Sequence, residues 1–408
     1  MNIVQDFSIG KYFTFDPSKG KPIYNWFYYK EAFSPEVVDY VLDGFAPNAK
    51  TLFDPFCGAG TSVLRAKERG ISSFAVDSSP LAVFVSRVKC ADYSESDIAE
   101  IKKFLDSFGN IKTQDSNSEA PSWDFELFPP RIAFPRSNLN SILSIRQQLE
   151  SVENQNAANF LMLALLSILP QTSLVVKDGG VLKIDKKKCA MPAKEAFRRK
   201  VKGMLADIKG AEGIEDVNGV ENAKNSSSGS TPDLIPDIRL GDSRRTEFES
   251  ESADVIVTSP PYLNNIDYSK IYGLELSLLA LNKRITSETR ARSVRSFISG
   301  DSFDASELSQ EVRDFADKIP IVGSYFSDIR AVLVEMHRIL RPGGIVGFVV
   351  GNSVIHETHI LVDEIIAEMA ESDGVGFSSA DVVVGLERIA DVRPKKVKTR
   401  ESIIIMRK

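Results

Sequence analysis

The chain has 408 residues, of which 43% are hydrophobic and 26% charged, and its formal net charge is −6. This length allows a large core and two or three domains, and the composition is that of a soluble globular protein. The acidic net charge argues against a globally basic nucleic-acid coat protein but is compatible with a local basic groove. The longest apolar run, Phe160–Leu169, is about half a membrane span.

Compartment and metal content can also be addressed from composition. The N-terminus lacks the basic start and apolar core of a signal peptide. The three cysteines, Cys57, Cys90 and Cys189, lie far apart, and the three histidines have no metal-ligand context. This pattern implies neither a disulfide framework nor a metal site. We therefore expect a reduced, cytoplasmic protein of prokaryotic type, without a metal or a membrane segment.

The first 50 residues are rich in aromatic side chains. Ser34 followed by Pro35 predicts a helix start, and the apolar spacing of Val37, Val38 and Val41 continues it. This segment either covers one sheet edge or, through the loop 26–35, forms a lid over a cofactor.

A glycine-containing turn follows the first predicted buried strand. The stretch DPFCGAGT places Gly58 and Gly60 between that strand and a helix. Glycines let the backbone approach a ligand closely, and a helix N-terminus favours an anionic group. The third glycine of a dinucleotide site is missing. About 20 residues further on, Asp77 ends a second strand and is suited to accept both ribose hydroxyls of a nucleoside cofactor.

Residues 91–237 interrupt the α/β pattern. They contain a strongly apolar helix, 157–169, whose role in a core is the simplest interpretation. Residues 177–202 then hold ten basic residues against three acidic ones. Such a run is either a solvated face or a surface that contacts nucleic-acid phosphates. Residues 210–237 have the composition of a flexible linker.

The α/β pattern resumes with a short strand that ends in Asp242, and then with DVIVTSPPY, residues 254–262. Two consecutive prolines must end the strand as a stiff, extended loop. A rigid loop at the carboxyl end of a parallel strand lies where open α/β sheets bind ligands. Its hydroxyl, carbonyl and aromatic ring could hold a planar base by an exocyclic amino group.

Two of these stretches resemble motifs of one family. TSPPY resembles motif IV, and DPFCGAGT motif I, of the amino-methylating DNA methyltransferases, especially the cytosine-N4 branch. The resemblance covers roughly 26–88 and 238–408. It implies S-adenosylmethionine as cofactor and double-stranded DNA as partner. The expected fold is a doubly wound, mostly parallel, seven-stranded α/β sheet of the Rossmann-like methyltransferase type, with an inserted helical and loop region for target recognition.

The resemblance also implies site residues and three regions. The catalytic loop would be Ser259, Pro260, Pro261 and Tyr262. The cofactor would be bound by Trp26, Phe33, Asp54, Phe56, Gly58, Gly60, Thr61, Asp77, Ser78, Asp242 and Ser243. Independently of the resemblance, the basic run 177–202 suggests that phosphates would be contacted by Lys177, Lys183, Lys186, Lys187, Lys188, Arg198, Arg199 and Lys200. Residues 1–90 would form the lid and cofactor half, 91–237 the target-recognition insert, and 238–408 the catalytic half.

The residue types in the loop 259–262 limit which atom of a base could be methylated. Hydrogen bonds from an amino group to Ser259 and to the Pro260 carbonyl would favour a nitrogen lone pair directed at a methyl donor, with the flipped base stacked on Tyr262. Methylation at carbon 5 would need a Pro-Cys thiolate, which the chain lacks. We expect cytosine-N4 methylation in a restriction–modification or phage-defence system, with a cognate endonuclease as partner. Adenine-N6 methylation, RNA guanine-N2 methylation and a silent nucleic-acid-binding relative remain open, and the recognition sequence and oligomeric state cannot be read.

Overall fold

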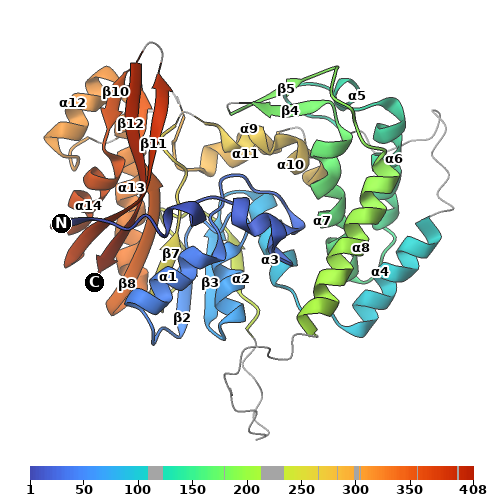
Figure 1. Cartoon of the computed structure of the whole chain (residues 1–408), viewed down its shortest axis with the longest axis horizontal. Helices are drawn as coiled ribbons and strands as arrows, with labels where there is room; N and C mark the ends of the chain where they lie inside the picture. The colour runs from blue at the N-terminus through green and yellow to red at the C-terminus, as the bar shows by residue number, and fades with distance from the viewer. Residues whose placement is uncertain are drawn as a thin grey trace, which may run out of the picture.

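The computed structural model describes residues 1–108, 123–178, 180–212, 234–264, 266–282, 284–297, 303, 305–355, 357–392 and 395–408. A large sheet lies beside a layer of helices, and both chain termini lie on the sheet side (Figure 1). Of the predicted linker 210–237, the part 213–233 lies outside the described residues.

The large sheet has eight strands among the described residues, in the order β1-β11-β12-β8-β7-β2-β3-β6. The run from β8 to β6 is parallel throughout, and β12 is antiparallel to both β8 and β11. The strands are β1 (Ile3–Gln5), β2 (Thr51–Asp54), β3 (Ser72–Asp77), β6 (Asp237–Leu240), β7 (Ala253–Thr258), β8 (Leu340–Gly351), β11 (Ser379–Val392) and β12 (Lys395–Arg407).

The mostly parallel α/β sheet is as expected, but the predicted count of seven strands is wrong by one. The additional strand is β1, whose three exposed residues pair in parallel with β11. A segment this short carries no apolar alternation, so its pairing could not be recognised from the pattern. The closing antiparallel pair is confirmed, and it is longer than predicted.

Helices cover both faces of the sheet, because neighbouring strand residues point to opposite sides. Leu52 and Val255 face α1 (Pro35–Phe45), where they join Val41 of that helix in one hydrophobic cluster. Phe53 and Ile256 face the other way, into the cluster formed with α13 (Pro320–Ile339) and α14 (Val362–Glu371). The sheet is therefore doubly wound, as predicted.

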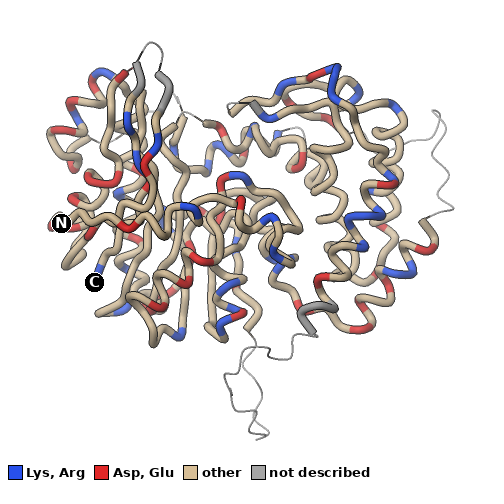
Figure 2. Tube along the Cα trace, viewed as in Figure 1, with Lys and Arg blue, Asp and Glu red and all other residues tan. Residues whose placement is uncertain are grey.

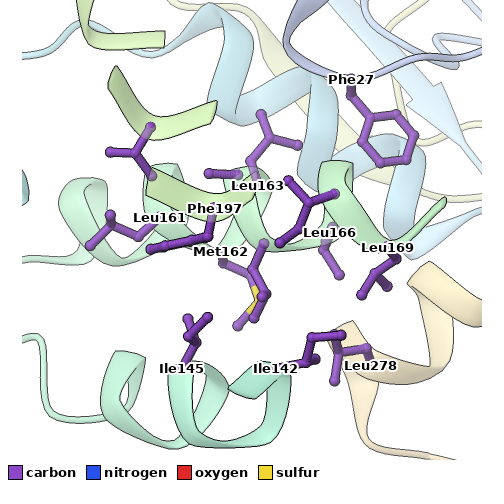
Figure 3. Close-up of a cluster of buried hydrophobic side chains, with 14 of the residues drawn as sticks. Phe27, Ile142, Ile145, Leu161, Met162, Leu163, Leu166, Leu169, Phe197 and Leu278 are labelled. Carbon is purple, nitrogen blue, oxygen red and sulfur yellow. The ribbon is translucent and has the colours of Figure 1, made fainter. Parts of the chain in front are cut away.

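The helical layer is built around α7 (Gln155–Thr172), on which every residue from Leu163 to Leu166 is fully buried. Figure 3 shows Met162 of α7 between Phe197 on one side and Ile145 on the other. The neighbouring elements are α4 (Glu95–Ser107), α5 (Pro130–Ala133), α6 (Arg136–Leu149), α8 (Ala193–Glu212) and the hairpin β4 (Val175–Asp178)–β5 (Val181–Ile184).

Elements from outside residues 91–237 join the same hydrophobic cluster, including α3 (Pro80–Cys90), α10 (Gly273–Ala280), and the residues Trp26 and Ile271. The helical layer is thereby packed against both the cofactor half and the catalytic half of the chain. The division into 1–90, 91–237 and 238–408 stays a prediction about function.

The remaining elements are short or connect the main ones: η1 (Gly10–Tyr12), η2 (Asp16–Gly20), η3 (Tyr24–Trp26), α2 (Thr61–Glu68), α9 (Tyr268–Ile271), α11 (Ile285–Arg292), α12 (Gln310–Lys318), β9 (Ser353–Ile355) and β10 (Thr358–Ile360). Among the described residues, no helix is both long and apolar enough to cross a membrane. The same residues contain no group of His, Cys, Asp or Glu side chains arranged to hold a metal ion.

Candidate active site

A cavity of about 550 Å³ lies where β2, β3 and β7 end. The carboxyl ends of parallel strands meet at one edge of the sheet, so segments far apart in the sequence converge there. The predicted site residues that line it are Phe33, Asp54, Phe56, Gly58, Thr61, Asp77, Ser78, Ser243, Ser259, Pro260, Pro261 and Tyr262. The cavity thus contains both the predicted cofactor loop and the predicted catalytic loop.

The glycine turn after β2 has the geometry that requires glycine. Gly58 and Gly60 have φ of 47° and 78°, which is the left-handed region. A Cβ on Gly60 would also come within 2.8 Å of Ser86 Oγ. The Asp77 carboxylate accepts hydrogen bonds from the backbone N–H of Gly58 at 2.9 Å and of Ser79 at 2.8 Å. Asp77 therefore fixes the shape of the turn as well as offering an acceptor to a ligand.

Asp54 connects the glycine turn after β2 to β7 by hydrogen bonds. Its side chain is 1% exposed and accepts hydrogen bonds from Ser62 Oγ, from Thr258 Oγ1 at 2.6 Å and from the Phe56 N–H at 3.0 Å. Because Thr258 directly precedes Ser259, this carboxylate helps to set where the Ser-Pro-Pro-Tyr loop begins.

Burial determines the charge state of the two carboxyl groups. It raises the pKa of Asp54 to about 6, although Ser62, Thr258 and the Phe56 N–H act in the opposite direction. Burial likewise raises the pKa of Asp77 to about 6, against the hydrogen bonds from the N–H groups of Ser79 and Gly58. Near neutral pH both groups are mostly ionised, and both become protonated as the pH falls below about 6.

The loop Ser259–Tyr262 ends on a tyrosine packed against the sheet. A Cβ built on Gly351 would lie 3.0 Å from Tyr262 Cε2, so the ring rests where β8 has no side chain. Burial, followed by the nearby Glu401 carboxylate, raises the pKa of Tyr262 well above its usual value. Tyr262 therefore stays neutral and offers the cavity an uncharged aromatic face.

The lid segment is divided between the cavity and the helical layer. Phe33 and Tyr29 line the cavity, and Tyr29 stacks on Tyr272 with ring centroids 4.4 Å apart. Trp26, which the sequence predicts to bind the cofactor, does not line the cavity. Its ring is 1% exposed, packs edge-on against Phe160 and donates through Nε1 to Asp207 at 2.9 Å. The apolar layer provides a better environment for this large side chain than the cavity wall does.

The strand β6 brings Ser243, but not Asp242, to the cavity. The Asp242 carboxylate instead accepts from Arg244, through Nη2 at 2.7 Å and through the backbone N–H at 2.9 Å. The sequence could not show this contact. An arginine two positions after the aspartate does not alter the strand pattern, and that pattern does not reveal that the two side chains bond to each other.

The residues predicted to contact phosphates lie on and near the β4–β5 hairpin and on α8, where Figure 2 shows Lys and Arg. Several of them have partners within the chain. Lys177 Nζ lies 3.8 Å from the centre of the Tyr272 ring. Lys188 Nζ donates to two backbone carbonyls, and burial lowers its pKa. Lys200 Nζ donates to the Asn25 carbonyl at 3.0 Å, and burial lowers its pKa to about 8.

Lys183, Lys186, Lys187, Arg198 and Arg199 are exposed, and Arg199 also donates to Gln171 and Met191. Contact of the whole set with phosphates stays a prediction.

Several cavity residues were missed by the sequence reasoning. They include Tyr29, Tyr272, Arg290, Arg388 and Glu401. The aromatic-rich lid pointed to the first of these. The other four carry no local motif, and only the packing of α10, α11 and the β11–β12 hairpin brings them to the cavity.

Comparison with known proteins gives relatives that match over most of the chain. Type II methyltransferase M.AvaI from Nostoc sp. is 26% identical, covering 92% of this chain and 83% of the relative. M.BsoBI from Geobacillus stearothermophilus is 24% identical over 98% and 88%, and M.MvaI from Kocuria varians is 22% identical over 79% and 74%. These relatives are all Type II methyltransferases. No protein-family model matches the chain.

Solved structures add little. An rRNA methyltransferase, aviRa from Streptomyces viridochromogenes, aligns with 94% of this chain and 84% of its own at 9% identity, with a TM-score of 0.25. At this TM-score the structural similarity says nothing about function.

Proposed function

We propose that this protein is a site-specific DNA methyltransferase that modifies the exocyclic N4 amino group of a flipped cytosine. The observation that carries the proposal is that one cavity holds both the Gly58–Asp77 turn and the loop Ser259–Tyr262. The Type II methyltransferase relatives support the reaction class. Their place in Type II systems also supports a cognate restriction endonuclease as a functional partner.

The cavity suits S-adenosylmethionine. The glycine turn admits a ligand close to the backbone, Asp77 can accept from ribose hydroxyls, and Phe33 and Phe56 add apolar wall. When bound, S-adenosylmethionine supplies a methyl group activated by a sulfonium. The role of the chain is then to place an amino nitrogen next to that group.

Ser259 and Pro260 provide the means to orient the base. The Ser259 hydroxyl accepts one amino N–H, and the Pro260 carbonyl accepts the other. These bonds draw the nitrogen out of conjugation with the ring and gain strength as it becomes cationic. The flipped base stacks on the neutral face of Tyr262, which replaces the stacking lost on leaving the duplex. Ser259 is small and neutral, which favours cytosine N4 over adenine N6.

The insert 91–237 would recognise the target, and its exposed basic residues would contact phosphates. Lys186 and Lys187 lie just after the β4–β5 hairpin and are exposed. Phosphate contacts position a duplex without specifying its sequence, so these residues would contribute affinity rather than specificity.

The test is nucleoside mass spectrometry of plasmid DNA incubated with the purified protein and S-adenosylmethionine. N4-methylcytosine is expected. Ser259→Ala should lower kcat about 10- to 150-fold, because a hydrogen bond to a cationic group contributes about 1.5–3 kcal/mol. Cofactor affinity should be unchanged. Ser151→Ala is the matched control, since Ser151 is exposed beyond α6. The absence of methylated nucleosides from DNA would overturn the proposal, and N6-methyladenine alone would overturn the choice of cytosine.

A further inference from the structure

A β-bulge turns part of β11 toward the cavity. Before the bulge Val384 pairs with Ser402, and after it Leu386 pairs with Glu401, so one extra residue lies in β11. Side chains alternate between faces, and the shift therefore places Leu386 and Arg388 on the face opposite to that of Val384.

The bulge is fixed by packing. Its extra residue is Gly385, where an added Cβ would lie 2.5 Å from Phe13 Cε2. A larger residue would have to displace that ring. The turned section of β11 is thus held in place by the N-terminal segment rather than by the hairpin alone.

Arg388 and Glu401 form an ion pair on the turned face. Arg388 Nη1 lies 3.1 Å from Glu401 Oε1, and both residues line the cavity. The Glu401 side chain is 15% exposed, whereas that of Arg388 is 48% exposed. The carboxylate is therefore the fixed partner. It also accepts from Arg388 Nη2 at 3.4 Å, so both Nη groups face Glu401 and a ligand would be met by the remaining N–H groups of the guanidinium.

The pair lies next to the catalytic loop. Glu401 is directly opposite Gly351 on β8. A Cβ on Gly351 would lie 3.3 Å from Glu401 Cγ and 3.0 Å from Tyr262 Cε2. The glutamate and the tyrosine ring therefore meet over the same glycine, and Arg388, paired with this glutamate, lines the same cavity as Tyr262.

We infer that Arg388, held by Glu401, determines base specificity by reading the N3 and O2 edge of the flipped cytosine. This inference rests on the proposed function. Beside its amino group, cytosine presents two neighbouring acceptors, N3 and O2. The guanidinium only donates and has a fixed fork of N–H groups, which matches two acceptors. Adenine presents N1 followed by C2–H at the same edge, so one N–H of the fork would face carbon.

Glu401 is a positioning residue in this arrangement. It has no need to touch the base, because its role is to hold the guanidinium plane toward the cavity. Substitution of either residue should therefore change the preference for cytosine over adenine, whereas a purely structural role would alter stability without changing that preference.

The experiment compares wild type with Arg388→Ala, Arg388→Lys and Glu401→Gln. The site methylated in plasmid DNA is first mapped, and oligonucleotides are then made with cytosine or adenine at the target position. Arg388→Ala should lower kcat/KM for the cytosine substrate about ten- to hundredfold, as expected for loss of one two-pronged contact. The adenine substrate should be affected less. Arg388→Lys should restore only part of the loss, and Glu401→Gln should shift the ratio in the same direction as Arg388→Ala.

Lys398→Ala is the matched control, because Lys398 lies on β12 of the same hairpin with its side chain 82% exposed. It should behave as wild type. Calorimetry should give unchanged S-adenosylmethionine affinity for every variant, which also shows that each is folded. An unchanged cytosine-to-adenine ratio in both Arg388→Ala and Glu401→Gln would overturn the inference while leaving DNA methylation intact. A wild-type protein that methylates no DNA would instead overturn the proposed function.

Discussion

Asp77 offers the most direct test of the cofactor site, because its carboxylate has two tasks. It accepts the N–H groups of Gly58 and Ser79 at 2.9 and 2.8 Å, and we propose that it also accepts ribose hydroxyls. A hydrogen bond to an ionised acceptor contributes about 1.5–3 kcal/mol. Asp77→Ala should therefore weaken S-adenosylmethionine binding by about 1.5–3 kcal/mol, or about 10- to 150-fold in Kd.

The same group predicts the pH dependence of binding. Burial raises the pKa of Asp77 to about 6. Ribose hydroxyls donate best to the ionised carboxylate, so below pH 6 a proton must be lost on binding and the apparent Kd should rise. The limit is about tenfold per pH unit for one group. Asp77→Asn removes this titration with a side chain of nearly the same size, but it loses one of the two bonds from the Gly58 and Ser79 N–H groups, because its amide nitrogen cannot accept. Its affinity is therefore compared with wild type as a function of pH rather than at one pH, and any dependence left belongs to Asp54, whose pKa is also about 6.

The assay is isothermal titration calorimetry of S-adenosylmethionine between pH 5 and 8. Wild type, Asp77→Asn and Asp77→Ala are measured in parallel, and thermal unfolding of each apoprotein checks that the fold is retained. An unchanged affinity in Asp77→Ala would refute the ribose assignment. Superimposable pH profiles for wild type and Asp77→Asn would refute the titration argument.

Three further outcomes are expected. Thr258→Val removes a 2.6 Å hydrogen bond to buried Asp54. It should lower the unfolding free energy by about 1.5–3 kcal/mol and should also lower kcat. Denaturant unfolding and turnover measure the two effects, and no change in either would contradict a role of Asp54 in placing the Ser259–Tyr262 loop. Burial lowers the pKa of Lys89 to about 7 from 10.5, so its charged form destabilises the fold at pH 7, and the contribution of this one group to stability should rise by up to about 5 kcal/mol as the pH increases toward 10.5. Between pH 7 and 10.5 Lys89→Met should therefore have a smaller pH slope of unfolding free energy than wild type, although Lys200, with its pKa lowered to about 8, still contributes to it; equal slopes in denaturant unfolding would disprove the effect of Lys89. Replacing Lys186 and Lys187 by Gln should reduce the salt slope of DNA binding by about 1 for each lost phosphate contact without changing the methylated sequence; filter binding across salt concentrations decides.

The sequence by itself determined the parts of the site that are encoded in short, continuous stretches. The glycine turn 58–60 and the loop 259–262 each follow a buried strand, so their local geometry was predictable from residue type. Their meeting in one cavity also followed, because the ends of parallel strands lie along one edge of the sheet. The covering of both faces of the sheet by helices was also predictable, because the alternating α/β order of the sequence leads to a sheet with helices on both sides.

The tertiary structure alone decided which side chains with ordinary sequence contexts reach the cavity. Trp26 and Lys200 were expected at ligands, but each has an internal partner more than a hundred residues away in the chain. Arg388 and Glu401 had no motif, and a single extra residue at Gly385 decides the face on which Arg388 lies. Strand periodicity in a sequence cannot reveal this, because the side chain that fixes the bulge, Phe13, belongs to a different part of the chain.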